Sequence, residues 1–451
     1  MTSMFGHHIR SDLLALYVAE AVAVFLAAYG LMAWGFAPIP SVADGWIAVM
    51  AGLLALAAGL VSGAAGLYQP SVMARARRVA RGGLVATILL VLGVWVAVQL
   101  FAPLDRSFSS SDLQLTLILG AVGGVSFARL AHALASRRGL LARRLLLIRD
   151  TATGRLSGQL KAGEGLPLLT MEVSLAAPTS VELIALLNPA WLRAHNLWAI
   201  VAPEGVNDAR LGAHCRDAGL RLLTEDEFLE CRLNRVAFER LPQDWLATAR
   251  STRPGRLEGA LRRGFDILVA LGLLFFALPV MLVTALLITL DGGGPIFYRQ
   301  ERSGLLRRSF YLYKFRSMVV DAEAGGVPRW ATAGDPRVTR LGRYLRLTRI
   351  DELPQLINVL RGDMSIVGPR PERPGFVEQL GGIIPHYHDR ASVKPGITGW
   401  AQVNYPYGAS VEDARMKLTY DLYYVSRRSL FLDLLILVAT VRVVLFQEGA
   451  R

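Results

Sequence analysis

The hydrophobic positions of this chain form long unbroken runs in its first third. Four such runs each have about the length of 17–25 residues that a helix needs to cross a bilayer. Polar and turn-forming residues separate them. The pattern therefore predicts a four-helix transmembrane bundle within residues 1–139. The runs lie at residues 13–33, 46–67, 84–101 and 113–134.

Positive charge is distributed unevenly around these runs. The second connecting loop and the segment after the fourth run are rich in arginine, whereas the first loop has no Lys or Arg and the third has only Arg106. The positive-inside rule therefore places both ends of the bundle in the cytoplasm. Glu20 and Arg129 lie inside apolar runs, where an ionisable residue can mark a pathway. A contact inside the bundle, or a place near the interface, is the simpler interpretation.

From residue 140 to residue 243 the pattern changes to short apolar runs that alternate with helical periodicity. Two of these runs, at residues 145–148 and 199–201, suggest buried strands. Together they indicate a small cytoplasmic parallel α/β domain of Rossmann-like type. The turn at residues 149–154 lacks the G-x-G-x-x-G pattern of dinucleotide sites. We therefore expect a scaffolding or regulatory role, with a linker at residues 244–255.

A fifth apolar run, at residues 265–290, has a proline near its middle. Pro279 removes a backbone hydrogen bond and favours a sharp kink. Basic residues flank the run on both sides, so both flanks belong on the cytoplasmic side. The pattern predicts a re-entrant hairpin, helix-break-helix, that enters and leaves by one leaflet. A kinked spanning helix is the alternative.

The last apolar run, at residues 430–446, is interrupted by Asp433 and Arg442. A helix that is mostly apolar but carries charges can lie in the membrane interface. We predict such an interfacial helix here, with a true span as the alternative.

Composition supports a membrane protein. Hydrophobic residues make up 53% of the chain and charged residues only 19%, and the net charge is +13. This balance fits loops that face anionic lipid, or acidic substrates. Nucleic acid is not an expected partner, because no nucleic-acid motif is present. Cys215 and Cys231 match no metal or redox spacing, which suggests a reduced compartment.

Candidate chemistry begins after the fifth run. The glycine run at residues 292–294 would let backbone N–H groups approach phosphate, although a plain turn is the commoner meaning. Lys314 and Arg316 stand two positions apart in an extended segment. Side chains with that spacing point the same way, so both could bind one phosphate group. An exposed basic strand is the alternative.

Two adjacent carboxylates, Asp351 and Glu352, precede a helical stretch. Asp351 is placed to be its N-cap, where the positive helix end keeps a carboxylate ionised. Ionised carboxylates can act as nucleophiles, and an Asp-Glu pair can hold Mg²⁺ together with substrate phosphates. An ordinary helix cap is the alternative.

Further polar groups follow. Prolines on both sides of Arg370 stiffen the backbone that presents it, which suits a fixed phosphate contact. Asp421 adds a third carboxylate beside tyrosines of the kind found at membrane interfaces.

Taken in order, these runs closely resemble those of the bacterial sugar transferases that act as polyprenyl-phosphate phosphoglycosyl transferases. The resemblance covers residues 256–451 and implies a mainly helical catalytic domain with a re-entrant membrane helix broken at a proline. The whole chain resembles the long members that start exopolysaccharide, capsule or O-antigen synthesis, whose N-terminal parts vary. The matching runs are residues 314–318, 351–355, 362–371, 394–404 and 421–425.

The resemblance implies a reaction. Asp351 would attack the β-phosphate of a UDP-sugar, releasing UMP and leaving a phosphosugar on the aspartate, which undecaprenyl phosphate would then take. Glu352 would help to hold Mg²⁺ or position the phosphates, so the metal ligands would be Asp351 and Glu352. Residues needed for activity in the family fall on Lys314 and Asp421, and phosphate-contacting arginines fall on Arg346 and Arg370.

The resemblance also implies a setting. Glucose or galactose is the favoured sugar, with N-acetylated sugars open. The expected location is the bacterial inner membrane, in contact with lipid and with the catalytic domain on the cytoplasmic face. A homodimer is plausible.

Two other classes of function compete with this one. A non-catalytic scaffold or regulator of polysaccharide export would have kept the fold without the chemistry. A polytopic transporter would need polar groups in several spans, and few are seen. A non-catalytic relative should have lost some of the polar residues of the site. All of them are present here, namely Lys314, Asp351, Glu352, Arg370 and Asp421.

Overall fold

The chain divides into two compact units in the computed structural model. One unit comprises residues 1–2 and 8–233, and the other comprises residues 3–7 and 234–451. Each unit has its own hydrophobic core. The structure describes residues 2–4, 7–9, 11–36, 44–73, 76–101, 110–138, 143–150, 168–175, 179–188, 197–202, 209–248, 255–292, 294–320, 322, 335–405, 408 and 410–446.

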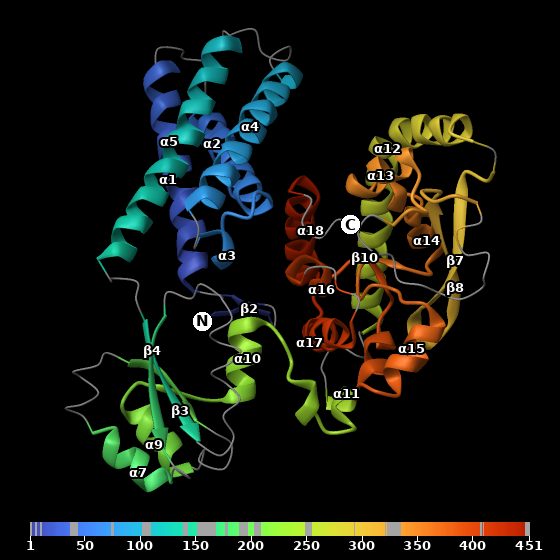
Figure 1. Cartoon of the computed structure of the whole chain (residues 1–451). Helices are drawn as coiled ribbons and strands as arrows, with labels where there is room; N and C mark the ends of the chain where they lie inside the picture. Colours follow the sequence, from blue (N-terminus) through green and yellow to red (C-terminus); the bar gives the residue numbers. More distant parts are fainter. Residues whose placement is uncertain are drawn as a thin grey trace. The chain divides into compact units, whose positions relative to one another are not determined.

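All four apolar runs of the first unit are helical, as predicted (Figure 1). Each helix is long and apolar enough to cross a membrane. Side chains from all four meet in one buried cluster. A short strand pair, β1 (Thr2–Met4) and β2 (His7–Ile9), begins the chain, and a short helix, α3 (Pro70–Met73), follows the second run. The long helices are α1 (Ser11–Phe36), α2 (Asp44–Ala64), α4 (Ala76–Phe101) and α5 (Ser110–Arg137).

Helices α1 and α5 pack closely because small residues line their contact. A Cβ atom added at Gly124 would lie 2.5 Å from the Cα atom of Val24, and one added at Gly120 would lie 2.8 Å from that of Ala28. Glycines spaced four apart let helix backbones approach in this way in membranes.

The two ionisable residues of this region bind each other. Arg129 Nη2 lies 2.7 Å from Glu20 Oε1, and the Tyr68 hydroxyl donates to Glu20 Oε2 at 2.5 Å. Glu20 is buried. The interpretation of these residues as a contact between helices is confirmed.

The rest of this unit contains a four-stranded sheet in the order β4-β3-β5-β6, with every pair parallel. Strand β3 is buried on both faces, since Leu146 and Ile148 join one core cluster and Leu145 and Leu147 join another. The expected parallel α/β sheet is present. Residues 151–154 of the turn without the glycine pattern lie outside the described residues. The elements are β3 (Arg143–Asp150), β4 (Leu168–Leu175), α7 (Ser180–Leu186), β5 (Leu197–Ala202), α9 (Ala209–Asp217), β6 (Arg221–Thr224) and α10 (Glu225–Leu233).

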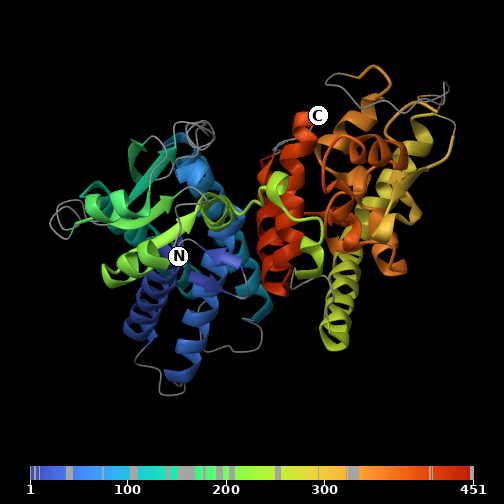
Figure 2. The ribbon, with the colours of Figure 1, turned by 90° about the horizontal axis from the view of Figure 1, so that it is seen from below.

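The second unit is mainly helical, with one antiparallel strand pair, β7–β8, and one parallel pair, β9–β10, in its described part (Figures 1 and 2). Its elements are η2 (Phe238–Arg240), α11 (Trp245–Thr248), α12 (Arg256–Leu290), β7 (Phe297–Ser303), η3 (Leu305–Arg307), β8 (Ser309–Phe315), α13 (Arg340–Leu347), η4 (Ile350–Glu352), α14 (Gln355–Arg361), β9 (Ser365–Val367), α15 (Pro374–Gly381), η5 (Tyr387–Ser392), β10 (Gly396–Thr398), α16 (Trp400–Asn404), α17 (Val411–Arg427) and α18 (Leu430–Leu445).

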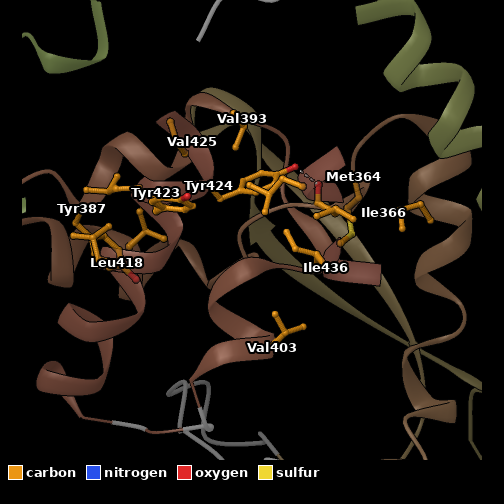
Figure 3. Packing of buried hydrophobic residues seen from close by; sticks show 14 of the residues in the cluster. Met364, Ile366, Tyr387, Val393, Val403, Leu418, Tyr423, Tyr424, Val425 and Ile436 are labelled. Carbon is orange, nitrogen blue, oxygen red and sulfur yellow. Dashed lines mark hydrogen bonds between the residues drawn. The ribbon is translucent and has the colours of Figure 1, made fainter. Parts of the chain in front are cut away.

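The core of this unit is built around α17. Figure 3 shows Tyr423 and Tyr424 of α17 among buried side chains from several other elements. The Tyr424 hydroxyl donates to the carbonyl of Val367 at 3.1 Å and to Asp433 at 2.7 Å. Strand β9, α17 and α18 are therefore joined at one buried point.

This unit begins earlier than the sequence pattern suggested. Phe238 and Trp245 lie in the core of the second unit, and Trp245 Nε1 donates to Asp389 at 2.6 Å. Apart from residues 3–7, the compact unit runs from Asn234 rather than from Arg256. Large aromatic side chains stabilise most where they are buried, so the first part of the predicted linker at residues 244–255 belongs to the fold.

Helix α12 contains Pro279 and stays helical through it. Figure 1 shows the helix changing direction within its length, so the expected break is a bend in a continuous helix. Both ends contact the second unit. Near the start, Asp266 accepts hydrogen bonds from Ser365, and near the end the carbonyl of Ile288 accepts one from Arg316. Apolar side chains between them, such as Phe276, are exposed.

The predicted last helix is present as α18, but its charges face inward. Asp433 is buried and lies 2.8 Å from Arg262, and the buried Arg442 donates to the carbonyl of Val403 at 2.8 Å. The charges that interrupt the apolar run therefore hold α18 to the second unit. Exposed Leu434 remains on its outer side. A place in the membrane interface stays a prediction.

Candidate active site

A group of charged side chains meets where β8, η4 and the segment after β9 come together. Glu352 Oε1 accepts from Lys314 Nζ at 2.8 Å and from Arg370 Nη2 at 2.7 Å. The structure thus brings together three residues that lie far apart in the sequence and that the sequence analysis selected. Two cations share one carboxylate oxygen, which makes a compact site with positive charge in excess.

Asp351 lies beside this group, and its carboxylate is uncommitted, meaning that no described side chain or backbone group binds it. The residue is 6% exposed and sits inside the short helix η4. The prediction that Asp351 caps the next helix is wrong: α14 begins at Gln355, its N-cap is Pro354, and no side chain caps it. Within the described chain, no hydrogen bond or ion pair holds the Asp351 carboxylate.

A residue with strained backbone lies two positions before Asp351. Arg349, which precedes η4, has a φ of 60°. A non-glycine residue in this left-handed region costs about 1–3 kcal/mol, and such residues cluster at functional sites. Arg349 lies between α13 and η4, directly before Ile350 and the acidic pair.

The two carboxylates have different electrostatic surroundings. Burial acts to raise the pKa of Glu352, but Arg370 and Lys314 outweigh it and hold that pKa well below its usual value. Burial raises the pKa of Asp351, and the nearby charge of Glu352 adds to the rise, against the attraction of Lys314 and Arg346. The expectation that a helix end keeps Asp351 ionised is therefore wrong: Asp351 does not cap α14, and its pKa is raised rather than lowered. The cations Lys314, Arg346 and Arg349 favour the charged form of Asp351 and oppose the effect of burial without outweighing it.

Arg346 and Arg316 differ in their relation to the site. Arg346 Nε donates to Ser317 Oγ at 3.1 Å, and its charge acts on Asp351. Arg316 instead donates to the backbone carbonyls of Ile288 at 3.1 Å and Gly292 at 2.8 Å.

Lys314 and Arg316 do not converge on one point, contrary to the strand-spacing prediction. Strand β8 ends at Phe315, so side-chain alternation does not extend to Arg316. The arginine serves instead to hold the end of α12.

The glycine run after α12 forms a turn in its described part. Gly292 and Gly294 have φ values of 142° and 131°, which only glycine adopts readily, while residue 293 lies outside the described residues. The Gly292 carbonyl accepts from Arg316. The commoner interpretation, a plain turn, fits these contacts.

Asp421 does not contact the acidic pair directly. Its Oδ2 atom lies 2.7 Å from Arg390 Nη2, and the same guanidinium donates to the backbone carbonyl of Arg370 at 3.0 Å. Asp421 is therefore linked to the site through Arg390. The sequence analysis missed Arg390, because it lies outside the motifs and its contacts with Arg370 and Asp421 are long-range.

The residues present allow a metal only as a partner of the substrate. Within the described residues, no group of three or more His, Cys, Asp or Glu side chains is placed to hold an ion. Mg²⁺ commonly takes one or two carboxylates and completes its shell with water and phosphate oxygens. Asp351, with its uncommitted carboxylate, fits such a site, and Glu352 adds Oε2, which lies 3.9 Å from Arg349.

Comparison with known proteins gives a family match that lies within the second unit. Residues 257–447 match the family described as "Bacterial sugar transferase". An Aeromonas hydrophila protein named UDP-N-acetylgalactosamine-undecaprenyl-phosphate N-acetylgalactosaminephosphotransferase is 43% identical over 242 residues, which is 54% of this chain and 56% of that protein. A UDP-glucose:undecaprenyl-phosphate glucose-1-phosphate transferase of Escherichia coli is 44% identical over 183 residues, 40% of this chain and 39% of that protein.

A shorter relative matches nearly end to end. The exopolysaccharide production protein PSS of Rhizobium leguminosarum is 42% identical over 189 residues, which is 40% of this chain and 93% of that protein. The chain thus matches only about a third to about half the length of the long relatives, but almost all of this short one. The family match, at residues 257–447, includes the charged site.

Proposed function

The chain belongs to the bacterial sugar transferase family, and we propose that it transfers a sugar 1-phosphate from a UDP-sugar to undecaprenyl phosphate. UMP is the other product. The observation that carries this proposal is the arrangement at Asp351, whose uncommitted carboxylate lies beside the cluster of Lys314, Glu352 and Arg370. The names of similar proteins supply the substrate classes.

Asp351 is the proposed nucleophile. A carboxylate oxygen of Asp351 attacks the β-phosphorus of the UDP-sugar, and a new P–O bond forms. The bond from that phosphorus to the oxygen bridging the α-phosphate breaks, and UMP leaves with the electron pair. The product is a phosphosugar ester of Asp351, and splitting a difficult transfer into two steps is the usual benefit of covalent catalysis.

The second step returns the enzyme to its starting state. A phosphate oxygen of undecaprenyl phosphate attacks the phosphorus of the intermediate, and the Asp351 carboxylate leaves. Lys314 and Arg370 are placed to neutralise phosphate charge in both steps, since both already lie at one carboxylate oxygen. Arg346 adds positive charge at Asp351.

Magnesium fits the proposal as a partner of the diphosphate. Asp351 and Glu352 would hold it, with substrate oxygens completing the shell. Bound there, the ion would offset the negative charge of the diphosphate. The chain's own part is to present the two carboxylates and surround them with Lys314, Arg370 and Arg346.

The membrane setting follows from the same reasoning. The four N-terminal helices act as a transmembrane bundle, and α12 acts as a re-entrant hairpin whose two ends remain at the cytoplasmic face. Exposed apolar residues around its bend, including Phe275 and Phe276, would contact lipid. The parallel sheet serves as a Rossmann-like accessory domain. In this setting the enzyme acts in the bacterial inner membrane, at the first membrane step of polysaccharide synthesis.

The direct test is release of UMP by the purified full-length protein with a panel of UDP-glucose, UDP-galactose and UDP-N-acetylgalactosamine. Names of similar proteins include both glucose and N-acetylgalactosamine transferases, so the panel covers both. We expect UMP from one sugar well above the others. A folded protein that releases no UMP from any sugar, with magnesium and undecaprenyl phosphate present, would instead support a non-catalytic scaffold of polysaccharide export.

A further inference from the structure

We propose that Arg390 is a positioning residue for Arg370, and that Asp421 acts on the reaction only through Arg390. This inference rests on the proposed function, because it assigns Arg370 to the substrate phosphates. It gives Asp421, which the family resemblance marks as needed for activity, a role that requires no contact with substrate.

The contacts of Arg390 converge on the backbone that carries Arg370. One nitrogen, Nη2, lies 2.7 Å from Asp421 Oδ2 and 3.0 Å from the carbonyl oxygen of Arg370. The other, Nη1, donates to the Tyr387 hydroxyl at 3.0 Å, and the guanidinium lies over the Tyr387 ring at 5.3 Å from its centre. Together, these partners hold the guanidinium in one orientation. The Arg370 carbonyl is therefore held at a defined place.

The elements that hold Arg390 both contribute side chains to the buried core. Arg390 and Tyr387 belong to η5, and Asp421 belongs to α17. Figure 3 shows Tyr387 beside Leu418 of α17 in the buried core. The ion pair between Arg390 and Asp421 therefore joins two elements that pack in one core. Through Arg390, the Arg370 carbonyl is held relative to that core.

A second arginine, from strand β7, binds the same segment. Arg302 of β7 donates to the carbonyl of Pro371 at 3.0 Å. Two successive carbonyls, those of Arg370 and Pro371, are thus each bound by a largely buried arginine. The prolines around Arg370 stiffen this segment further. The side chain carried by this doubly bound segment, that of Arg370, contacts Glu352 at 2.7 Å.

The competing explanation is that Asp421 and Arg390 form only a structural ion pair between η5 and α17. Burial would lower the pKa of Arg390, but the charge of Asp421 raises it above its ordinary value, so the arginine remains charged in either case. The two explanations differ in where a perturbation acts. A structural pair affects the amount of folded protein, whereas a positioning residue affects catalysis through Arg370 alone.

A double-mutant cycle separates them. We measure kcat/KM for UMP release by the full-length parent, Arg390→Lys, Arg370→Lys and the double variant. Misplacing a catalytic contact by about 1 Å can cost about 100-fold, so we expect Arg390→Lys to lower kcat/KM by about 10- to 100-fold in the parent. In the Arg370→Lys background the same change should have almost no effect, because the residue that it positions is already altered. Asp421→Asn, which removes the charge but keeps the shape, should behave like Arg390→Lys.

Thermal unfolding and the amount of folded protein are recorded for every variant. Arg307→Lys is the matched control, because Arg307 is half exposed and pairs with Glu378 at 3.5 Å on the surface. Its kcat/KM should equal that of the parent. Equal factors for Arg390→Lys in the two backgrounds would overturn the inference, and so would a parent-like Asp421→Asn. An inactive parent would instead overturn the proposed function itself. If Arg390→Lys does not fold, the cycle is run with Asp421→Asn and the same criteria apply.

Discussion

Removing the charge of Glu352 is the sharpest test of the charged cluster. Glu352 Oε1 receives charge-assisted hydrogen bonds from Lys314 at 2.8 Å and Arg370 at 2.7 Å, and the Glu352 side chain is only 11% exposed. Glu352→Gln keeps the shape but removes the negative charge that both cations contact directly. A hydrogen bond to a charged group contributes about 1.5–3 kcal/mol. Because Arg370 is 28% exposed and partly screened, we take the lower end, about 3 kcal/mol for the pair of bonds.

That magnitude sets the expected loss of activity. Loss of one placed electrostatic contact typically lowers kcat by about 10²–10³-fold, or about 2.7–4 kcal/mol, and the two cations here lose their common anchor. We therefore expect the initial rate of UMP release to fall by about 10²–10³-fold in Glu352→Gln. Combining Glu352→Gln with Lys314→Met should be far less than additive, because both changes disrupt one contact.

The assay uses purified full-length protein in detergent, with thermal unfolding measured beside the rate. Glu378→Gln is the control, since Glu378 is exposed and pairs only with Arg307 at the surface in the described structure. The control should keep the parent's rate. A folded Glu352→Gln whose rate stays within about threefold of the parent would show that the cluster does not position phosphate.

The remaining predictions concern the limits of the unit and the course of α12. A shortened chain beginning at Asn234 should unfold at higher temperature than one beginning at Arg256, because the longer chain keeps the core aromatics Phe238 and Trp245. Calorimetry or dye-monitored unfolding measures the two unfolding midpoints, and equal midpoints would contradict this prediction. Pro279→Leu should favour a straight spanning α12, because a proline inside a helix disfavours straightness by about 3 kcal/mol or more. Single cysteines at Arg262 and Lys314 should be equally accessible to a membrane-impermeant reagent in the parent, and opposite accessibility would refute the hairpin.

Local pattern predicted much of the fold. The four N-terminal helices follow from continuous apolar runs, and the parallel sheet follows from short buried runs separated by helical periodicity. Both signals depend on neighbouring residues, so a sequence carries them well. The same holds for α12, where Pro279 indicated a change of direction.

Tertiary contacts account for what the pattern did not predict. The start of the second unit depends on where Phe238 and Trp245 are buried, which no local period reveals. Asp351 was expected to cap a helix that in fact starts at Gln355. Arg316 was expected beside Lys314, but the strand ends between them.

The candidate site shows the same division. Residue type and motif order selected Lys314, Glu352 and Arg370, and the fold brings them into contact. Arg390 escaped notice because the two partners that link it to the site, Arg370 and Asp421, lie 20 and 31 positions away. A residue that acts through long-range contacts carries no local signal of its role.

The central claim is that Asp351 carries the phosphosugar during the reaction. The decisive measurement is mass spectrometry of the full-length protein incubated with UDP-sugar and Mg²⁺, without undecaprenyl phosphate. We predict one added phosphosugar mass on a peptide containing Asp351, and UMP released in step with it. Asp351→Asn should fold, carry no added mass and release no UMP. If UMP appears only when both substrates are present, no peptide gains mass, and Asp351→Asn keeps near-parental activity, then the covalent mechanism is contradicted.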